Sequence, residues 1–282
     1  MFDLCLLYHE ISDDPSILLS GFGNITIDPT TFAMHMKVIK EKYGDRILIT
    51  FDDGYKSASE LAPNILGDDI KNTIWFINSS LAGNKDVFWL SKLIWLYVDK
   101  KLKPPMRTNI ISATYLDAWG KMHYSNGLMC WIDSVSMKEY WKGIAKREQI
   151  YVNSIHDIND GRLFGIHTAT HPNCNNISYD TFGVEVALCD KFVAVENKAT
   201  QFFAFPFGEF GKHWGVSHLQ HEALSAYSII FTVGLAGSEF NKVFPRFEVP
   251  TDIMTESGVI SFVEDCLWKT HYYSQLTKEH SF

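Results

Sequence analysis

The sequence predicts an α/β fold in which parallel strands close into a barrel. Short runs rich in β-branched and aromatic residues alternate with segments of helical periodicity, and this alternation implies parallel strand pairing. Polar residues directly follow several of these runs, and the carboxyl ends of barrel strands are where reactive side chains gather. Seven or eight strand–helix units would close such a barrel.

Seven runs are predicted to be strands. Each is short, apolar, and rich in the residue types that favour extended structure. They are Leu4–Tyr8, Arg46–Phe51, Thr73–Asn78, Leu163–His167, Phe202–Phe205, Ile229–Val233 and Val243–Val249.

Helices are predicted between most of these strands. The segment Pro29–Tyr43 follows Asp28, which is a suitable N-cap, and carries apolar residues at helical spacing. The same periodicity predicts helices over Ser57–Leu66, Ser178–Ala194 and Trp214–Tyr227. On the last of these, His218, His221 and Glu222 are expected to form a solvated face, because their order is not that of a metalloprotease motif.

The segment from about 88 to 157 interrupts the alternation of strands and helices. It begins with Phe88-Trp89-Leu90 and contains a basic, proline-containing stretch at 100–107. We predict a mostly helical insertion within one catalytic domain that spans residues 1–282.

Composition narrows the classes of function. Of the 282 residues, 46% are hydrophobic and 14% aromatic, which is enough for a sizeable core. The net charge of −8 argues against nucleic acid and favours an uncharged or weakly charged substrate. The five cysteines are scattered and form no Cys-x-x-Cys pair, which is typical of reduced thiols. Without a basic leader or a run of roughly 20 apolar residues, we expect a cytoplasmic protein with no transmembrane segment.

Two adjacent carboxylates end the second predicted strand. Asp52 and Asp53 would repel each other there unless a cation or a proton-transfer task occupies the space between them. Asp53-Gly54 is also a common turn pair. The apolar run before it and the histidines later in the chain favour a functional site.

Two histidines follow the fourth predicted strand. His167 and His171 alone could equally decorate a helix, but together with Asp53 they match the ligands of a hydrolytic zinc site, which also accepts Co²⁺ or Ni²⁺. Such a metal lowers the pKa of its bound water to roughly 7. Asp52 could then act as the base, a backbone N–H could hold the oxyanion, and a histidine could protonate the leaving amine.

Four motifs, in this order, resemble those of the polysaccharide deacetylase family (NodB homology, similar to carbohydrate esterase family 4). They are Leu7-Tyr8-His9-Glu10-Ile11, Thr50-Phe51-Asp52-Asp53-Gly54, His167-Thr168-x-x-His171 and Phe205-Pro206-Phe207-Gly208. The first is similar to the Tyr-His-x-Ile start of one branch of the family. The resemblance covers nearly the whole chain.

The resemblance implies a distorted (β/α)7-type barrel that removes acetyl groups from N-acetylated sugars with a divalent metal. It implies these roles: Asp52 as the base, Asp53, His167 and His171 as metal ligands, Thr168 as support for the histidine turn, and the N–H of Phe207, after Pro206, at the oxyanion.

Two family features are missing. The late Leu-x-His that supplies the general acid is absent, and we expect His9 to replace it, because a barrel places its first and last strands side by side. The arginine before the proline-containing turn is also absent, and Arg246 is the candidate to hold Asp52 instead.

The expected substrate is a cytoplasmic lipid-linked or nucleotide-linked sugar of surface-polysaccharide synthesis, such as O-antigen synthesis. A lipid-linked substrate would bring peripheral contact with a membrane. A deformylase or an O-deacetylase could use the same metal site. An inactive, metal-bearing carbohydrate-binding protein is a further alternative, although it would not need Asp52.

Overall fold

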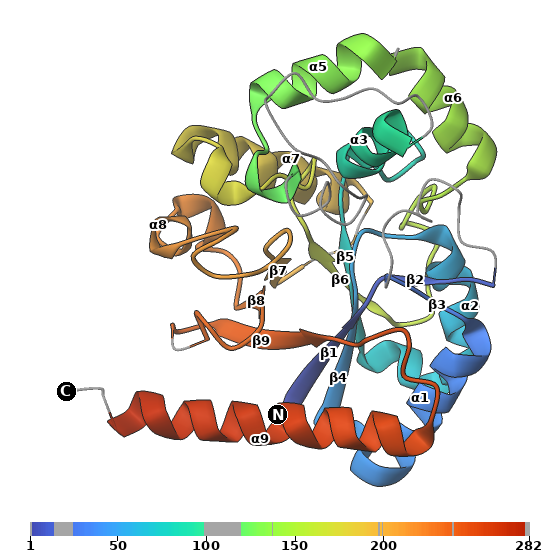
Figure 1. The fold of residues 1–282 in the computed structure, drawn as a ribbon, viewed down its shortest axis with the longest axis vertical. Helices are drawn as coiled ribbons and strands as arrows, with labels where there is room; N and C mark the ends of the chain where they lie inside the picture. The colour runs from blue at the N-terminus through green and yellow to red at the C-terminus, as the bar shows by residue number, and fades with distance from the viewer. Residues whose placement is uncertain are drawn as a thin grey trace.

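Seven parallel strands form a closed barrel in the computed structural model of this chain (Figure 1). The structure describes residues 2–13, 25–98, 120–136, 138–196, 198, 200–238 and 240–279. The strand order around the barrel is β1, β4, β5, β6, β7, β8, β9. The predicted distorted (β/α)7-type barrel is therefore confirmed.

The strands match the predicted runs to within one residue at each end. Their bounds are β1 (Leu4–Tyr8), β4 (Ile47–Phe51), β5 (Thr73–Ile77), β6 (Leu163–Ile166), β7 (Phe202–Ala204), β8 (Ile229–Val233) and β9 (Val243–Glu248). Two further short strands, β2 (Glu10–Ile11) and β3 (Thr26–Ile27), form a separate parallel pair that the sequence pattern did not reveal.

Burial on both faces explains why these runs are so apolar. Every residue of β1, β4 and β5 is buried, as is usual for parallel strands covered by helices. Alternate positions contribute to two separate apolar clusters. The smaller cluster fills the barrel interior and consists of Cys5, Leu48, Ile74, Phe76, Ala204 and Phe231.

The barrel closes between its first and last strands. β1 pairs with β9 in parallel, with Leu6 opposite Phe247 and Leu7 opposite Glu248. His9, which follows β1, therefore lies at the same barrel edge as the end of β9.

Three helices were predicted to within one residue: α1 (Pro29–Tyr43), α2 (Lys56–Leu66) and α7 (Tyr179–Val195). Asp28 caps α1, because its Oδ1 accepts hydrogen bonds from the backbone N–H groups of Thr30 at 3.0 Å and Thr31 at 2.9 Å. Short 3₁₀ turns η1 (Gly44–Arg46), η2 (Gly67–Asn72) and η3 (Cys174–Asn176) lie between larger elements.

The segment between β5 and β6 contains α3 (Trp89–Val98), α5 (Asn126–Ser136) and α6 (Lys138–Glu148). Figure 1 shows these helices at the end of the barrel toward which β1 and β4 point. They therefore lie near the loops that follow the strands. The basic stretch at 100–107 lies outside the described residues.

The prediction of one helix over Trp214–Tyr227 was wrong. The segment forms only α8 (Val216–Leu219) and the turn η4 (Glu222–Leu224). The Nδ1 of His218 accepts a hydrogen bond from Gly215 N, and that of His221 accepts one from Ala223 N, each at 3.0 Å. These local bonds favour caps and turns over a continuous helix.

The expected solvated face on this segment was wrong for its two histidines, although Glu222 is exposed. His218 and His221 are buried, and their Nε2 atoms donate to the backbone carbonyls of Cys174 and Tyr179, each at 3.1 Å. They join this segment to the loop before α7 and to the start of that helix.

A long helix that the sequence analysis did not predict, α9 (Glu256–Glu279), follows the barrel and packs against α1. In the part of the chain that the structure describes, we find no helix with both the length and the apolar character needed to cross a bilayer.

Candidate functional site

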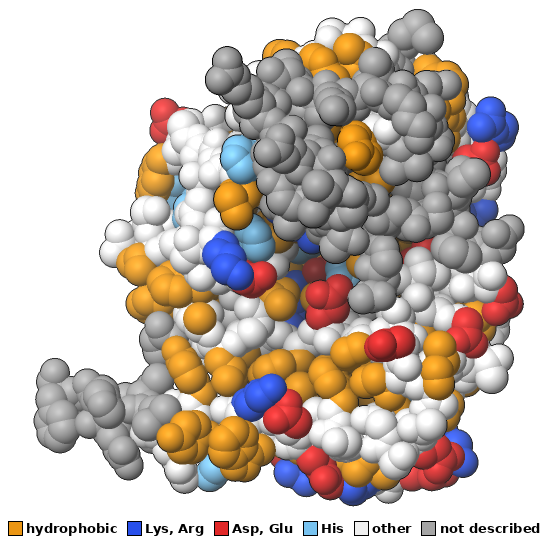
Figure 2. Space-filling model, viewed as in Figure 1, with side chains coloured by type: hydrophobic (Ala, Val, Ile, Leu, Met, Phe, Trp, Pro, Cys, Tyr) orange, Lys and Arg blue, Asp and Glu red, His pale blue; other side chains and the backbone are white. Residues whose placement is uncertain are grey.

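A cavity of about 470 Å³ opens at the carboxyl ends of the strands. Figure 2 shows a hollow near the centre of one face, where acidic, basic and histidine side chains meet. The predicted site residues that line the cavity are His9, Asp52, Asp53, His167, His171 and Phe207. Thr168, Pro206 and Arg246 lie behind this lining and are buried.

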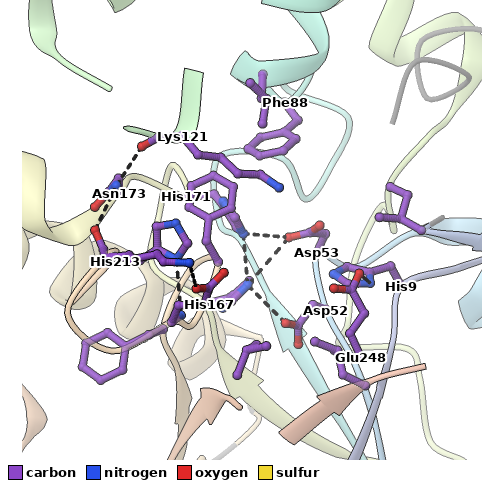
Figure 3. A pocket seen from close by; sticks show the side chains of 18 of the residues that line it. His9, Asp52, Asp53, Phe88, Lys121, His167, His171, Asn173, His213 and Glu248 are labelled. Atoms are coloured by element: carbon purple, nitrogen blue, oxygen red, sulfur yellow. Dashed lines mark hydrogen bonds and ion pairs between the residues drawn. The ribbon is translucent and has the colours of Figure 1, made fainter. Parts of the chain in front are cut away.

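Three donor groups converge in the cavity (Figure 3). The Nε2 atoms of His167 and His171 lie 3.1 Å apart. Asp53 Oδ1 lies 3.4 Å from His171 Nε2 and 3.9 Å from His167 Nε2. All three ligand atoms fall within 4.8 Å of one another, which is the arrangement expected around one shared cation.

The surroundings of these groups fit a metal ion. His167 Nδ1 donates to the carbonyl of Ala204 at 2.8 Å, which leaves the Nε2 lone pair directed at the other two ligands. Burial lowers the pKa of His171, so this imidazole is neutral, as a ligand must be. Asp53 Oδ1 is buried and has no hydrogen-bond donor among the described residues, so a cation would satisfy it.

The backbone of the site is strained. Asp53 (φ 68°), Thr168 (φ 63°), His171 (φ 57°) and Phe207 (φ 57°) all adopt the left-handed conformation. They are four of the seven described non-glycine residues with positive φ. Such residues persist only when the surroundings hold them, and they cluster at functional sites.

The loop 167–171 is fixed by its neighbours. Thr168 Oγ1 accepts from His171 N at 3.2 Å, so it braces the turn between the two histidines. Glu185 of α7 accepts from Thr170 N at 2.7 Å and from Thr170 Oγ1 at 2.8 Å. Asn78 Nδ2 donates to the carbonyl of His167. The sequence analysis missed Glu185 and Asn78, and only the position of Asn78 at a strand end could have indicated a role.

Asp52 forms an ion pair with Arg246. The two guanidinium nitrogens lie 2.6 and 2.8 Å from the two carboxylate oxygens. Arg246 is fully buried, and its guanidinium carbon lies 5.0 Å from the ring centroid of Phe76 and 5.8 Å from that of Phe231. Burial alone would raise the pKa of Asp52, but the charge of Arg246, followed by that of His167, brings it below the ordinary value.

His9 lies across the cavity from the histidine loop (Figure 3). Its Nδ1 is 3.9 Å from Oε1 of Glu248, and its side chain is 15% exposed. Glu248 also lines the cavity and was missed, although barrel closure places the end of β9 beside β1.

The turn after β7 is packed tightly against β8. A Cβ on Gly208, whose φ is +71°, would lie 2.5 Å from Val233 Cγ2. The carbonyl of Gly208 accepts from Trp214 Nε1 at 2.7 Å. This packing sets the position of Phe207, whose ring centroid lies 4.5 Å from that of His171.

Aromatic residues at the start of the insertion cover the histidines. The ring centroid of Phe88 lies 4.8 Å from that of His171, and Trp89 Nε1 donates to the carbonyl of His171 at 3.0 Å. Both aromatic residues are buried. They exclude water from one side of the donor set.

The wall beyond the histidine loop carries Lys121, Asn173, Lys212 and His213, none of which the sequence analysis identified. Burial lowers the pKa of His213 to about 4, against the opposing charge of Glu209. This imidazole is therefore neutral at pH 7, and its Nδ1 accepts from Glu209 N at 3.3 Å.

Solved structures share the fold of this chain, whereas comparisons of its sequence identify no family. No family model matches the sequence, and no curated protein matches it either. The deacetylase PplD from Streptococcus pyogenes, whose structure was determined in complex with acetate, superimposes with a TM-score of 0.51 at 14% identity. The match covers 92% of this chain and 96% of PplD.

This chain has the fold of PplD. The resemblance to polysaccharide deacetylases is thereby confirmed at the level of the fold. IcaB from Ammonifex degensii gives a TM-score of 0.49 at 13% identity, with 90% of this chain and 94% of IcaB covered. A de-N-acetylase from Aggregatibacter actinomycetemcomitans gives 0.47 at 13% identity, with coverage of 92% and 98%.

Proposed function

We propose that this protein is a metal-dependent hydrolase that removes the N-acetyl group from an amino sugar. The observation that carries the proposal is a buried Asp-His-His donor set beside a carboxylate, Asp52, that is ion-paired with Arg246. A metal site that only binds a sugar does not need this second buried carboxylate.

Asp53, His167 and His171 would hold the metal, with zinc as the default and Co²⁺ or Ni²⁺ as alternatives. When bound, the ion would polarise the acetyl carbonyl and lower the pKa of a water molecule.

The residues around the donor set would accept and donate protons and stabilise the oxyanion. The ion pair with Arg246 keeps Asp52 ionised, so its carboxylate accepts a proton from the attacking water. The N–H of Phe207 would stabilise the negative charge on the carbonyl oxygen. His9, on the opposite side of the cavity, would donate the proton that the leaving amine requires.

The shared fold supports removal of an acetyl group, because PplD is a deacetylase whose structure was determined in complex with acetate. A cavity of about 470 Å³ is in the range of small-molecule sites. We propose a lipid-linked or nucleotide-linked N-acetyl sugar, handled in the cytoplasm during surface-polysaccharide synthesis.

Acetate release from N-acetylated sugars tests this function. We expect release that is abolished by a chelator and restored by zinc. Asp52→Asn should retain the metal but reduce release by about 10²–10⁴-fold, since it removes the base. Asp160→Asn is a matched control, because Asp160 pairs with buried Arg162 away from the cavity and should not affect release.

Other outcomes would replace the proposal. Release of formate alone would indicate a deformylase, and release only from O-acetyl sugars would indicate an esterase. Sugar binding by the metal-loaded protein without any release would indicate a carbohydrate-binding protein.

A further inference from the structure

The cavity contains a cation that the proposed reaction does not use. Lys121 lines it together with His171, and its Nζ lies 5.3 Å from the ring centroid of Phe207. Figure 3 shows the Lys121 side chain extending over His171 into the cavity. Its positive charge therefore lies beside the donor set and not on the outer surface.

The backbone of Lys121 is held relative to the donor set. Asn173, which is buried and lies two residues after His171, donates from Nδ2 to the carbonyl of Lys121 at 2.7 Å. On the preceding residue, a Cβ on Gly120 would lie 2.7 Å from Leu90 Cδ1, so this segment packs directly on α3. Lys121 is therefore held at the cavity by the hydrogen bond from Asn173 and by the packing of Gly120 against α3.

Asn173 also contacts a second lysine of the cavity wall, Lys212. Asn173 Nδ2 also approaches the carbonyl of Lys212 at 3.4 Å, and Lys212 lines the cavity. The Lys212 ammonium forms an ion pair with Glu209 at the rim. Lys121 extends over His171 and is the lysine of this wall that lies beside the donor set.

Charge is separated across the cavity. The wall that carries Lys121 and Lys212 also carries one acidic residue, Glu209, which pairs with Lys212. Glu248 lies on the opposite side of the cavity with His9 (Figure 3). The overall charge of −8 had suggested an uncharged substrate, but this wall is locally positive.

We propose that Lys121 binds an anionic group, a phosphate or a carboxylate, that is attached to the amino sugar. An anionic substituent would form a charge-assisted hydrogen bond and an ion pair with this ammonium, whereas a neutral N-acetyl sugar offers it only uncharged acceptors. The inference rests on the proposed function and specifies the class of sugar that the site accepts.

Binding of deacetylated products tests the inference in the metal-loaded protein, because these compounds cannot be turned over. Calorimetry would compare glucosamine, galactosamine and mannosamine 1-phosphates with their neutral methyl glycosides, and with the corresponding amino-uronic acids to separate phosphate from carboxylate. We expect at least one anionic sugar to bind about 10–100-fold more tightly than its neutral counterpart, as for a hydrogen bond to a charged group. High salt should reduce this preference.

Variants assign the preference to Lys121. Lys121→Met should abolish it and Lys121→Arg should retain it, while Lys191→Met, at an exposed position on α7, should not affect it. The inference is wrong if the wild-type protein shows no anionic preference, or if the preference survives in Lys121→Met. It is also wrong if Lys121→Met weakens the binding of neutral and anionic sugars equally. An anionic preference without acetate release would instead contradict the proposed function alone.

Discussion

Arg246 binds both carboxylate oxygens of Asp52 inside the barrel, although the two residues lie 194 positions apart in the sequence. The pair joins the last strand of the barrel to the end of the second one. Arg246 gives the proposed base a buried counter-charge. This charge lowers the pKa of Asp52 below its ordinary value, against the effect of burial.

Replacing Arg246 by methionine should affect both stability and turnover. The change leaves Asp52 buried without a counter-charge, so we expect the free energy of unfolding to fall by about 3–5 kcal/mol. The pKa of Asp52 should rise, so a smaller fraction of this group is ionised and able to accept a proton at neutral pH. Urea denaturation and kcat measured on folded protein check both effects.

Arg162→Met is the control for this experiment. Arg162 is also buried and paired, with Asp160, but lies outside the cavity lining. It should lose stability while kcat stays unchanged. Equal losses of kcat in both variants would assign the effect to general destabilisation.

His9→Ala should separate proton donation from metal binding. If His9 protonates the leaving amine, kcat should fall by about 10²–10⁴-fold. The zinc content should not change, because the donor set does not include His9. His271→Ala, at an exposed position on α9, serves as the control. Intact turnover in His9→Ala with metal bound would show that another group is the acid.

Glu185→Ala should weaken metal binding without removing a ligand. Glu185 holds Thr170, and with it the strained loop between the two histidines. Loss of this kind of support typically lowers metal affinity by about 10–100-fold. Competition with a coloured chelator measures the zinc affinity, and Asp180→Ala, exposed at the start of α7, is the control. An unchanged affinity in Glu185→Ala would mean that the loop keeps its shape without this contact.

His35 should make stability depend on pH. It is buried, its Nε2 donates to the carbonyl of Ile253 at 2.8 Å, and its Nδ1 accepts from Tyr8 at 3.2 Å. Burial lowers its pKa in the folded protein. Below about pH 6.5 the unfolded chain therefore binds a proton that the folded protein does not, so stability falls as the pH falls.

The variant His35→Gln cannot titrate and should show less of this fall. The stability difference between wild type and His35→Gln should therefore be larger at pH 7.5 than at pH 5.5, as measured by urea denaturation. A difference that stays constant over this range would contradict the burial argument. His271→Gln, which changes an exposed histidine, controls for general effects of pH.

The barrel was predictable because its strands are buried on both faces. An apolar run such as Ile47–Phe51 must stop where the barrel stops, and Asp52 marks that point in the sequence. The helix predicted over Trp214–Tyr227 failed because histidine side chains bond to the nearby backbone there, and spacing alone does not show such bonds.

Some residues of the candidate site were likewise predictable from the sequence, and others were not. Asp53 and His167 stand close to strand ends and His171 lies in the loop that follows β6, so their convergence follows from the topology. Glu185 and Lys121 depend on contacts between loops and helices that are distant in sequence. No local pattern indicates these contacts, and only the folded chain shows them.

Barrel closure through β1 and β9 also affects how the protein is made. A chain emerging from the ribosome presents both aspartates and both histidines before Arg246 has been synthesised. Until β9 follows, the barrel stays open at one seam and the Asp52 carboxylate has no guanidinium to pair with. The proposed activity is therefore acquired only after β9 has been synthesised and has joined the barrel.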